Sequence, residues 1–147
     1  MVEKIPIGSD HAGFELKEQV KEYLAKLGYE PEDFGTTGTE SVDYPDYAAK
    51  VAGHVSSGER KRGILVCGTG LGMSIAANKF KGVRAALVTD ENLAALSRRH
   101  NDANVLALGG RTTSPDLARR IVKTWLDTEF EGGRHSERVG KIAKSEK

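Results

Sequence analysis

The sequence predicts an α/β protein, a three-layer α/β/α sandwich with a five-stranded parallel sheet and a helical tail at the C-terminus. Two observations lead to this fold class. Segments of strand length alternate with amphipathic segments of helical period, and most of the strand segments are continuously apolar. Continuous apolar strands are typical of a parallel sheet that helices cover on both faces, and right-handed crossovers then favour a doubly wound arrangement.

The first half of the chain predicts two strands and two helices. A short apolar segment comes first, and apolar residues then recur at helical spacing until Gly28, a typical helix stop. Pro45 opens the second helix, since proline is well placed in a first turn. Pro6 fits badly, because a proline inside a strand has no N–H for the ladder. We expect strands at 5–9 and 30–34, a polar loop at 35–43, and helices at 16–27 and 45–57.

The second half repeats this alternation. Ser114, Pro115 and Asp116 form a strong cap-and-start signal for the last long helix, whose apolar stripe includes Trp125. We expect strands at 63–67, 83–88 and 104–108, a helix that ends near residue 80, a helix at 90–99 and a helix that begins at 115.

Composition and charge indicate one soluble domain spanning residues 1–147. A hydrophobic fraction of 38% suits a single core. The single cysteine, Cys67, excludes an internal disulfide. The sequence has neither a signal-peptide pattern nor an apolar run of about 18 residues, so we expect a cytoplasmic protein with no membrane partner. The net charge of +1 argues against a nucleic-acid partner.

The C-terminal tail, residues 132–147, begins at a break formed by Gly132 and Gly133 and is locally basic. Its helical spacing depends mainly on Val139 and Ile142, so this helix is marginal alone. One interpretation is a solvated and partly disordered end. The other is a tail that packs against a second subunit.

The segment from Ile64 to Asn78 is the most informative part of the chain. Its cysteine, Cys67, closes an apolar strand, and glycines follow at positions 68, 70 and 72. Glycines let the backbone bend sharply, and the helix that follows offers free N–H groups and a positive dipole end to an anion or a thiolate. The alternative interpretation is that Cys67 is a small buried hydrophobe beside an ordinary turn.

A nicotinamide site is a minority interpretation of the same loop. Asp90 lies about 20 residues downstream, where an acidic residue would bind a ribose. Met73 opposes this interpretation, because it occupies the third position of the glycine pattern and is too bulky for close contact between helix and strand.

Candidate site residues cluster near the predicted ends of strands, and ligands of doubly wound sheets bind beyond the carboxyl ends. They include a thiol, two imidazoles and three arginines, and the planar fork of arginine suits phosphate. Arg134 and Arg138 are four residues apart, which fits either a shared grip on one phosphate or a solvated charged face. No group has the sequence spacing of a zinc site. The candidates are Asp10, His11, Cys67, Thr69, His100, Asn101, Arg111, Arg134 and Arg138.

Several stretches of the chain resemble the type B ribose-5-phosphate isomerases, whose family also contains the subunits of galactose-6-phosphate isomerase. The stretches occur in the family's order and cover nearly the whole chain, so together they are far more specific than one glycine loop. They are GSDHAGF at 8–14, DYPDYA at 43–48, CGTGLGMSIAANK at 67–79, the pair His100-Asn101, and EGGRH at 131–135.

The resemblance implies an aldose–ketose isomerase without metal or cofactor that interconverts D-ribose 5-phosphate and D-ribulose 5-phosphate, with a Rossmann-like subunit in a homodimer. It implies that Cys67 carries the proton between C2 and C1 and that Thr69 assists proton movement between the two oxygens. His100 and Asp10 match residues linked to opening of the furanose ring. The implied contacts with the enediolate are Asn101 and the loop amides of Gly68, Gly70, Leu71, Gly72 and Ser74. The implied contacts with the phosphate are His11, Arg111, Arg134 and Arg138, and the neighbouring subunit supplies the tail arginines Arg134 and Arg138.

Three alternatives stay open at this point. A non-catalytic phosphosugar-binding protein would share the arginines and the glycine loop, although it has no need of the Cys67 thiol. The second alternative is that the substrate is a six-carbon phosphosugar such as allose or galactose 6-phosphate. Galactose-6-phosphate isomerase divides its site between two different chains, so a complete set of residues in one chain favours ribose 5-phosphate. A homodimer and a tetramer both fit the sequence.

Overall fold

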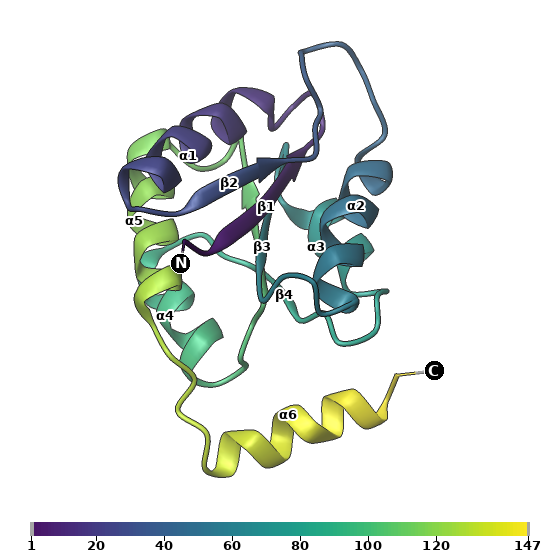
Figure 1. The fold of residues 1–147 in the computed structure, drawn as a ribbon, viewed down its shortest axis with the longest axis vertical. Coiled ribbons are helices and arrows are strands. Elements are labelled where there is room, and N and C mark those ends of the chain that lie inside the picture. Colours follow the sequence, from purple (N-terminus) through teal and green to yellow (C-terminus); the bar gives the residue numbers. More distant parts are fainter. Residues whose placement is uncertain (1, 147) are drawn as a thin grey trace.

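The computed structural model describes residues 2–146 and shows a parallel sheet between two layers of helices (Figure 1). Every expected strand and helix forms, although α3 and β4 are shorter than expected. None of the helices in the described residues is both long and apolar enough to cross a membrane. The elements are β1 (Lys4–Ser9), α1 (Phe14–Lys26), β2 (Glu30–Asp33), α2 (Tyr44–Ser56), β3 (Gly63–Cys67), α3 (Leu71–Ala77), β4 (Ala85–Leu87), α4 (Glu91–Arg99), β5 (Val105–Gly109), α5 (Pro115–Asp127) and α6 (Arg134–Lys144).

The sheet has the strand order β2-β1-β3-β5-β4, and every neighbouring pair is parallel. Helix α1, which follows β1, packs on one face, whereas α3, which follows β3, packs on the other (Figure 1). β1 and β3 are neighbours, and the chain leaves the carboxyl end of β1 toward one face of the sheet and the carboxyl end of β3 toward the other. This is the topological switch point, where doubly wound sheets open a crevice for ligands.

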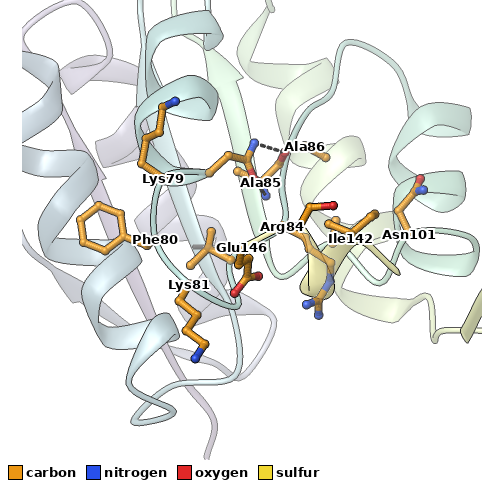
Figure 2. Close-up of a pocket in the computed structure, with 13 residues that line it drawn as sticks. Lys79, Phe80, Lys81, Arg84, Ala85, Ala86, Asn101, Ile142 and Glu146 are labelled. Carbon is orange, nitrogen blue, oxygen red and sulfur yellow. Dashed lines mark hydrogen bonds between the residues drawn. The ribbon is translucent and has the colours of Figure 1, made fainter. Parts of the chain in front are cut away.

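Helix α6 touches the body of the chain near its two ends. His135 stacks on His100, and Glu146, just beyond the helix, accepts the Gly82 N–H through Oε1 at 3.0 Å. Between these contacts lies a cavity of about 720 Å³, lined by Ile142 and by the chain around β4 (Figure 2). Ile142 is 48% exposed, so the tail buries little apolar surface within its own chain.

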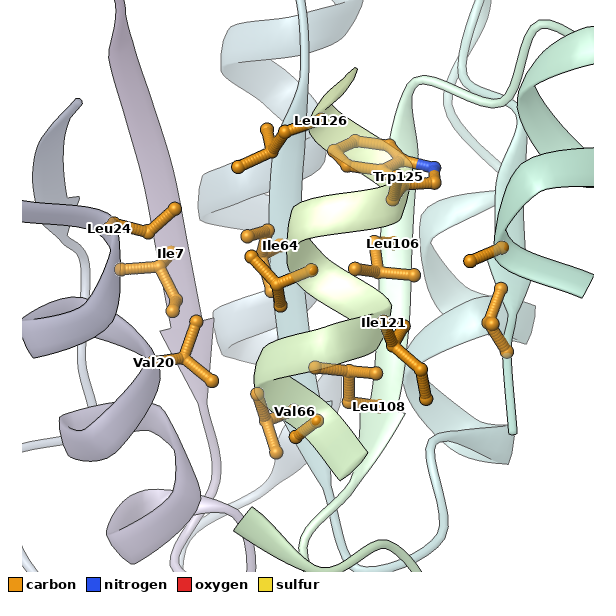
Figure 3. Close-up of a cluster of buried hydrophobic side chains, with 14 of the residues drawn as sticks. Ile7, Val20, Leu24, Ile64, Val66, Leu106, Leu108, Ile121, Trp125 and Leu126 are labelled. Carbon is orange, nitrogen blue, oxygen red and sulfur yellow. The ribbon is translucent and has the colours of Figure 1, made fainter. Parts of the chain in front are cut away.

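Two apolar layers hold the sheet between the helices. Alternate residues of β3 point to opposite faces: Ile64 and Val66 pack with α1, α4 and α5, whereas Leu65 and Cys67 pack with α2 and α3. Figure 3 shows the first layer, in which Trp125 of α5 is completely buried. The thiol of Cys67 therefore faces α2 and α3, beside the loop that starts α3.

Pro6 lies in the interior strand β1 without breaking the sheet. Pairing of β1 with β3 begins at Ile7 and Ile64, one residue beyond Pro6, so the missing N–H falls before that ladder starts. Gly63 gives the proline ring room, since a Cβ at Gly63 would lie 3.3 Å from Pro6 Cγ. The position of Pro6 in the register explains why the strand tolerates it.

An ion pair between a buried lysine and a partly exposed aspartate fixes the end of β2 beside the crevice. The Lys17 side chain of α1 is fully buried, and its Nζ lies 2.6 Å from Asp33 Oδ2. Asp33 also binds Lys21 Nζ at 2.7 Å and accepts the Gly35 N–H at 2.8 Å through Oδ1. Burial alone would raise the pKa of Asp33, but the hydrogen bonds from Lys17 and Lys21 outweigh burial and lower that pKa below its usual value.

Replacing Lys17 by methionine is expected to destabilise the fold. Removing one partner of a buried pair typically costs about 3–5 kcal/mol, and because Asp33 keeps Lys21 we expect about 2–3 kcal/mol in the free energy of unfolding by urea. Lys21→Met is the matched control, since it removes the partly exposed partner of the same carboxylate and should cost about 0–1 kcal/mol. Equal losses in the two variants would contradict a special role for the buried lysine.

Candidate active site

The carboxyl ends of β1, β3 and β5 bring three predicted site segments together. The Asp10 N–H donates to the Val66 carbonyl oxygen at 3.3 Å, and the Gly110 N–H donates to the Cys67 carbonyl oxygen at 2.8 Å. The segments also pack closely, because a Cβ at Gly110 would lie 2.7 Å from the Ala12 carbonyl oxygen. The crevice at the switch point is formed by residues 10–13, 67–74 and 109–111.

Cys67 ends β3 with its side chain buried in this crevice. The Gly70 N–H donates a hydrogen bond to Cys67 Sγ at 3.2 Å. A donor aimed at sulfur stabilises the negative charge that a thiolate base carries. Only glycine fits at position 70, because φ is +84° and a Cβ would lie 2.5 Å from Leu87 Cδ1. The turn that provides this donor therefore depends on Gly70.

Three of the five loop amides implied to bind the enediolate already donate within the chain. Besides the Gly70 N–H on Cys67, the Leu71 N–H donates to Thr69 Oγ1 at 3.2 Å. The Ser74 N–H donates to the Gly70 carbonyl oxygen at 3.0 Å, as in an ordinary helix turn. The Thr69 hydroxyl accepts in its bond, so its own hydrogen stays available to a ligand.

The remaining two loop amides belong to glycines that lie next to two larger side chains. Within residues 2–146, the N–H groups of Gly68 and Gly72 have no hydrogen-bond partner. The guanidinium of Arg111 lies along Gly68, where a Cβ would be 3.5 Å from Nη1, and in the same range it forms no hydrogen bond or ion pair. The Tyr44 ring lies over Gly72, where a Cβ would be 2.6 Å from a ring carbon. Tyr44 has no role that the sequence alone predicts, and only its place in the stretch at 43–48 could have indicated one.

Asp10 and His11 follow β1, and backbone N–H groups hold both side chains. Asp10 Oδ1 accepts the Gly13 N–H at 3.0 Å, just before α1. His11 Nδ1 accepts the Val42 N–H at 3.1 Å from the loop that precedes α2. Because Nδ1 accepts, the ring hydrogen is on Nε2, which leaves one N–H donor for an anion.

His100 and Asn101 lie near the amino ends of the strands, at the opposite edge of the sheet from Cys67. They follow α4 and lead into β5, whose first residue, Val105, pairs with Gly63 at the start of β3. Four residue steps of about 3.3 Å separate Gly63 from Cys67, a span of about 13 Å. The sequence places His100 and Asn101 in one candidate site with Cys67, and the single chain does not bring them together.

The opposite edge gathers its own set of imidazoles and arginines. The rings of His100 and His135 stack with centroids 4.3 Å apart and planes 14° apart. Burial, followed by the charges of His100 and Arg134, lowers the pKa of His135 below its usual value. Arg134 and Arg138 are exposed on the same helix, α6. The sequence indicates no role for His135 beyond its place in the stretch at 131–135, because its neighbour His100 is distant in the sequence.

Asp90 has a structural role in place of the ribose contact that the minority interpretation needs. Its Oδ1 accepts the Leu93 N–H at 2.8 Å and so caps the start of α4. An N-cap acid satisfies a helix N–H that would otherwise lack a partner. The observation that favoured a nicotinamide site is thereby explained by local structure.

The fold and the crevice define a doubly wound α/β protein with a glycine-rich ligand loop at its switch point. The chain belongs to the ribose/galactose isomerase family, whose model matches residues 5–142. It is 50% identical to ribose-5-phosphate isomerase B of Escherichia coli (strain K12), and the match covers 96% of this chain and 95% of that protein.

Solved structures agree with this assignment. A ribose-5-phosphate isomerase B of Clostridium thermocellum superposes with a TM-score of 0.94 and 61% identity over 96% of this chain and 95% of that chain. The enzyme of Mycoplasma genitalium with bound ribulose-5-phosphate gives a TM-score of 0.93 and 44% identity over 98% of this chain and 96% of that chain. The chain is thus an isomerase, and the predicted fold class is confirmed.

Proposed function

We propose that this isomerase interconverts D-ribose 5-phosphate and D-ribulose 5-phosphate through a cis-enediolate, as a step of the pentose phosphate pathway. The observation that carries the proposal is the buried Cys67 thiol with a backbone donor on its sulfur, beside two free loop amides at the switch point. The relatives named above support the substrate. A non-catalytic binding protein has no need of this thiol.

Cys67 is the base in the central step. Its thiolate takes the C2 proton of the open-chain aldehyde, the C2–H electron pair forms the double bond between C1 and C2, and the aldehyde oxygen gains the negative charge. The thiol then returns the proton to C1 to give the ketose. Thr69 moves a proton between the two oxygens, and the N–H groups of Gly68 and Gly72 stabilise the oxyanion, where one preorganised donor contributes about 2.7–4 kcal/mol.

The phosphate and the ring oxygen need other side chains. His11 offers an Nε2–H and Arg111 offers a free guanidinium at the carboxyl edge. His100, with Asp10, opens the furanose ring, Asn101 contacts the enediolate, and the phosphate contacts are completed by Arg134 and Arg138. Asp10 lies at the carboxyl edge with Cys67, His11 and Arg111, and these residues form the first set. The second set lies at the opposite edge of the sheet in the same chain and consists of His100, Asn101, Arg134 and Arg138.

A second copy of the chain would bring the two sets together in a homodimer. Large apolar side chains are exposed beside the edge strand β4: Leu71 and Ile75 on α3 are 54% and 63% exposed, and Leu93 on α4 is 43% exposed. Exposed apolar patches of this kind mark interaction surfaces. A two-fold axis beside β4 and perpendicular to the strands reverses the direction of the partner's strands. The amino ends of one chain's strands, near which His100 lies, then lie beside the carboxyl ends of the partner's strands.

We also propose a cytoplasmic location, which suits a chain whose one cysteine is a free thiol. The tail, residues 132–147, then acts as the arm that completes the partner's site. Its weak anchoring within its own chain, with Ile142 half exposed, supports that role.

Incubation with ribose 5-phosphate in D₂O tests the proposed function. With EDTA present and no nicotinamide added, we expect ribulose 5-phosphate that carries solvent deuterium at C1, because the thiol exchanges its proton with solvent. Allose 6-phosphate and galactose 6-phosphate, assayed in parallel, test the six-carbon alternative. No turnover of any of the three sugars, or a product that never acquires deuterium, would contradict the proposal.

A further inference from the structure

The stacked histidines of the opposite edge lie beside an acidic side chain. His100, Glu131 and His135 each present one possible ligand atom, and these three atoms lie within 4.8 Å of one another. The backbone holds the cluster in place, because the Glu131 N–H donates to the Arg99 carbonyl oxygen at 3.1 Å and the His135 N–H to the Gly132 carbonyl oxygen at the same distance. The cluster therefore joins the end of α4 to the start of α6.

Two imidazoles and one carboxylate are a donor set that zinc uses in three-ligand sites with an open fourth position. Imidazole also suits cobalt, nickel and copper, whereas magnesium and calcium prefer oxygen ligands alone. The chemistry of the cluster thus selects a divalent transition metal. None of the three residues forms a side-chain hydrogen bond within residues 2–146, so their ligand atoms are available.

Binding requires a small rearrangement of the two rings. Ligand atoms at about 2.0–2.1 Å from a tetrahedral ion lie about 3.3 Å apart, whereas the three atoms of the cluster lie within 4.8 Å of one another, so any pair must close by about 1.5 Å at most. Nearly parallel rings, 14° apart, must also tilt, because the nitrogen lone pairs lie in the ring planes.

We propose that His100, Glu131 and His135 form a site for a divalent transition metal of the zinc class, and that metal bound there inhibits isomerisation. The inhibition rests on the proposed function, because a ring nitrogen of His100 that binds a metal cannot serve in ring opening. The metal is an inhibitor here and takes no part in the reaction. Inhibition should therefore be stronger with ribose 5-phosphate, which must be opened, than with ribulose 5-phosphate.

Cobalt(II) binding to the full-length protein tests the site without any measurement of activity. We expect one equivalent per chain, with the visible absorption bands of four-coordinate cobalt, and competition by Zn²⁺. His135→Ala should weaken binding about tenfold or more, by analogy with the loss that follows disruption of a metal site's supporting groups. Glu131→Gln should weaken binding in the same direction, because the amide removes the carboxylate charge.

Two variants serve as matched controls. His54→Ala removes an exposed imidazole whose Nε2 lies 3.6 Å from Glu59, a His–Glu pair without a second histidine. Cys67→Ala removes the one thiol that could bind zinc elsewhere. Both controls should bind cobalt as the parent chain does. Unchanged binding in His135→Ala, or loss of the absorption bands in Cys67→Ala, would overturn the site.

The activity measurement is separate. Zn²⁺ should slow turnover of ribose 5-phosphate, EDTA should restore it, and His135→Ala should resist Zn²⁺ relative to its own metal-free rate. Metal bound with the expected spectrum but without any slowing would overturn the inhibition. If the chain does not isomerise any phosphosugar, the cobalt measurement still decides whether the site exists, so the two proposals fail independently.

Discussion

Replacing Cys67 by alanine is expected to lower isomerisation in both directions by about 10²–10⁴-fold or more, the range that a positioned acid–base group contributes. The proposed function gives the thiol a role only in proton transfer, so binding of a non-isomerisable analogue such as ribitol 5-phosphate should change little. The assays are turnover of ribose 5-phosphate and calorimetric titration with the analogue.

Cys67→Ser is the companion variant, because it keeps a hydroxyl at the same place and leaves the Gly70 donor with an acceptor. We expect it to be nearly as inactive, since a hydroxyl is a far weaker acid than a thiol and a poor base here. Thermal unfolding of both variants controls for misfolding. Turnover near that of the parent in a well-folded Cys67→Ala would return Cys67 to the role of a small buried hydrophobe.

Replacing His100 by asparagine is expected to impair turnover of ribose 5-phosphate more than proton exchange from ribulose 5-phosphate. His100 is assigned to ring opening, and ribulose 5-phosphate cannot close a furanose through O5, because that oxygen carries the phosphate. We expect a loss of about 10²–10⁴-fold for the cyclic sugar and a smaller loss for the ketose.

Single-turnover experiments in D₂O separate the two steps. They measure product formation from ribose 5-phosphate and deuterium exchange at C1 of ribulose 5-phosphate for the same preparation of His100→Asn. An equal loss in both measurements would assign His100 to the enediolate step or to the fold.

The sequence predicted the fold and the grouping of candidate residues at the carboxyl edge because both depend on local patterns. Continuous apolar runs such as 63–67 and caps such as Ser114 reflect local physics, and the structure shows the expected strand and the cap, with Ser114 Oγ accepting the Leu117 N–H. The cysteine that ends a strand and the glycines that follow it are likewise contiguous, so their proximity needed no tertiary information.

Other features depend on which segments meet in space. His100 precedes β5 and lies at the amino-terminal edge, whereas Cys67 lies at the carboxyl edge, and the strand order decides that separation. The stacking of His100 on His135 depends on how α6 returns after the double-glycine break. The full burial of Lys17 also runs against the usual exposure of lysine, and the carboxylates of Asp33 and Glu18, at 2.6 Å and 3.0 Å from its Nζ, explain it.

The central claim is a site built from the carboxyl edge of one chain and the opposite edge of its partner, and subunit mixing tests it most directly. In the proposed homodimer, Cys67→Ala removes the base from every site, and His100→Asn removes the ring-opening imidazole from every site. After exchange at equal amounts, half of the dimers are mixed, and each mixed dimer has one intact site of two.

Activity on ribose 5-phosphate in the mixture should therefore rise far above either parent variant, to about a quarter of that of the unmodified protein. Native mass spectrometry of the same mixture confirms that the chains have exchanged. Verified mixed dimers without any rise in activity would show that Cys67 and His100 act in the same chain, and would contradict the account.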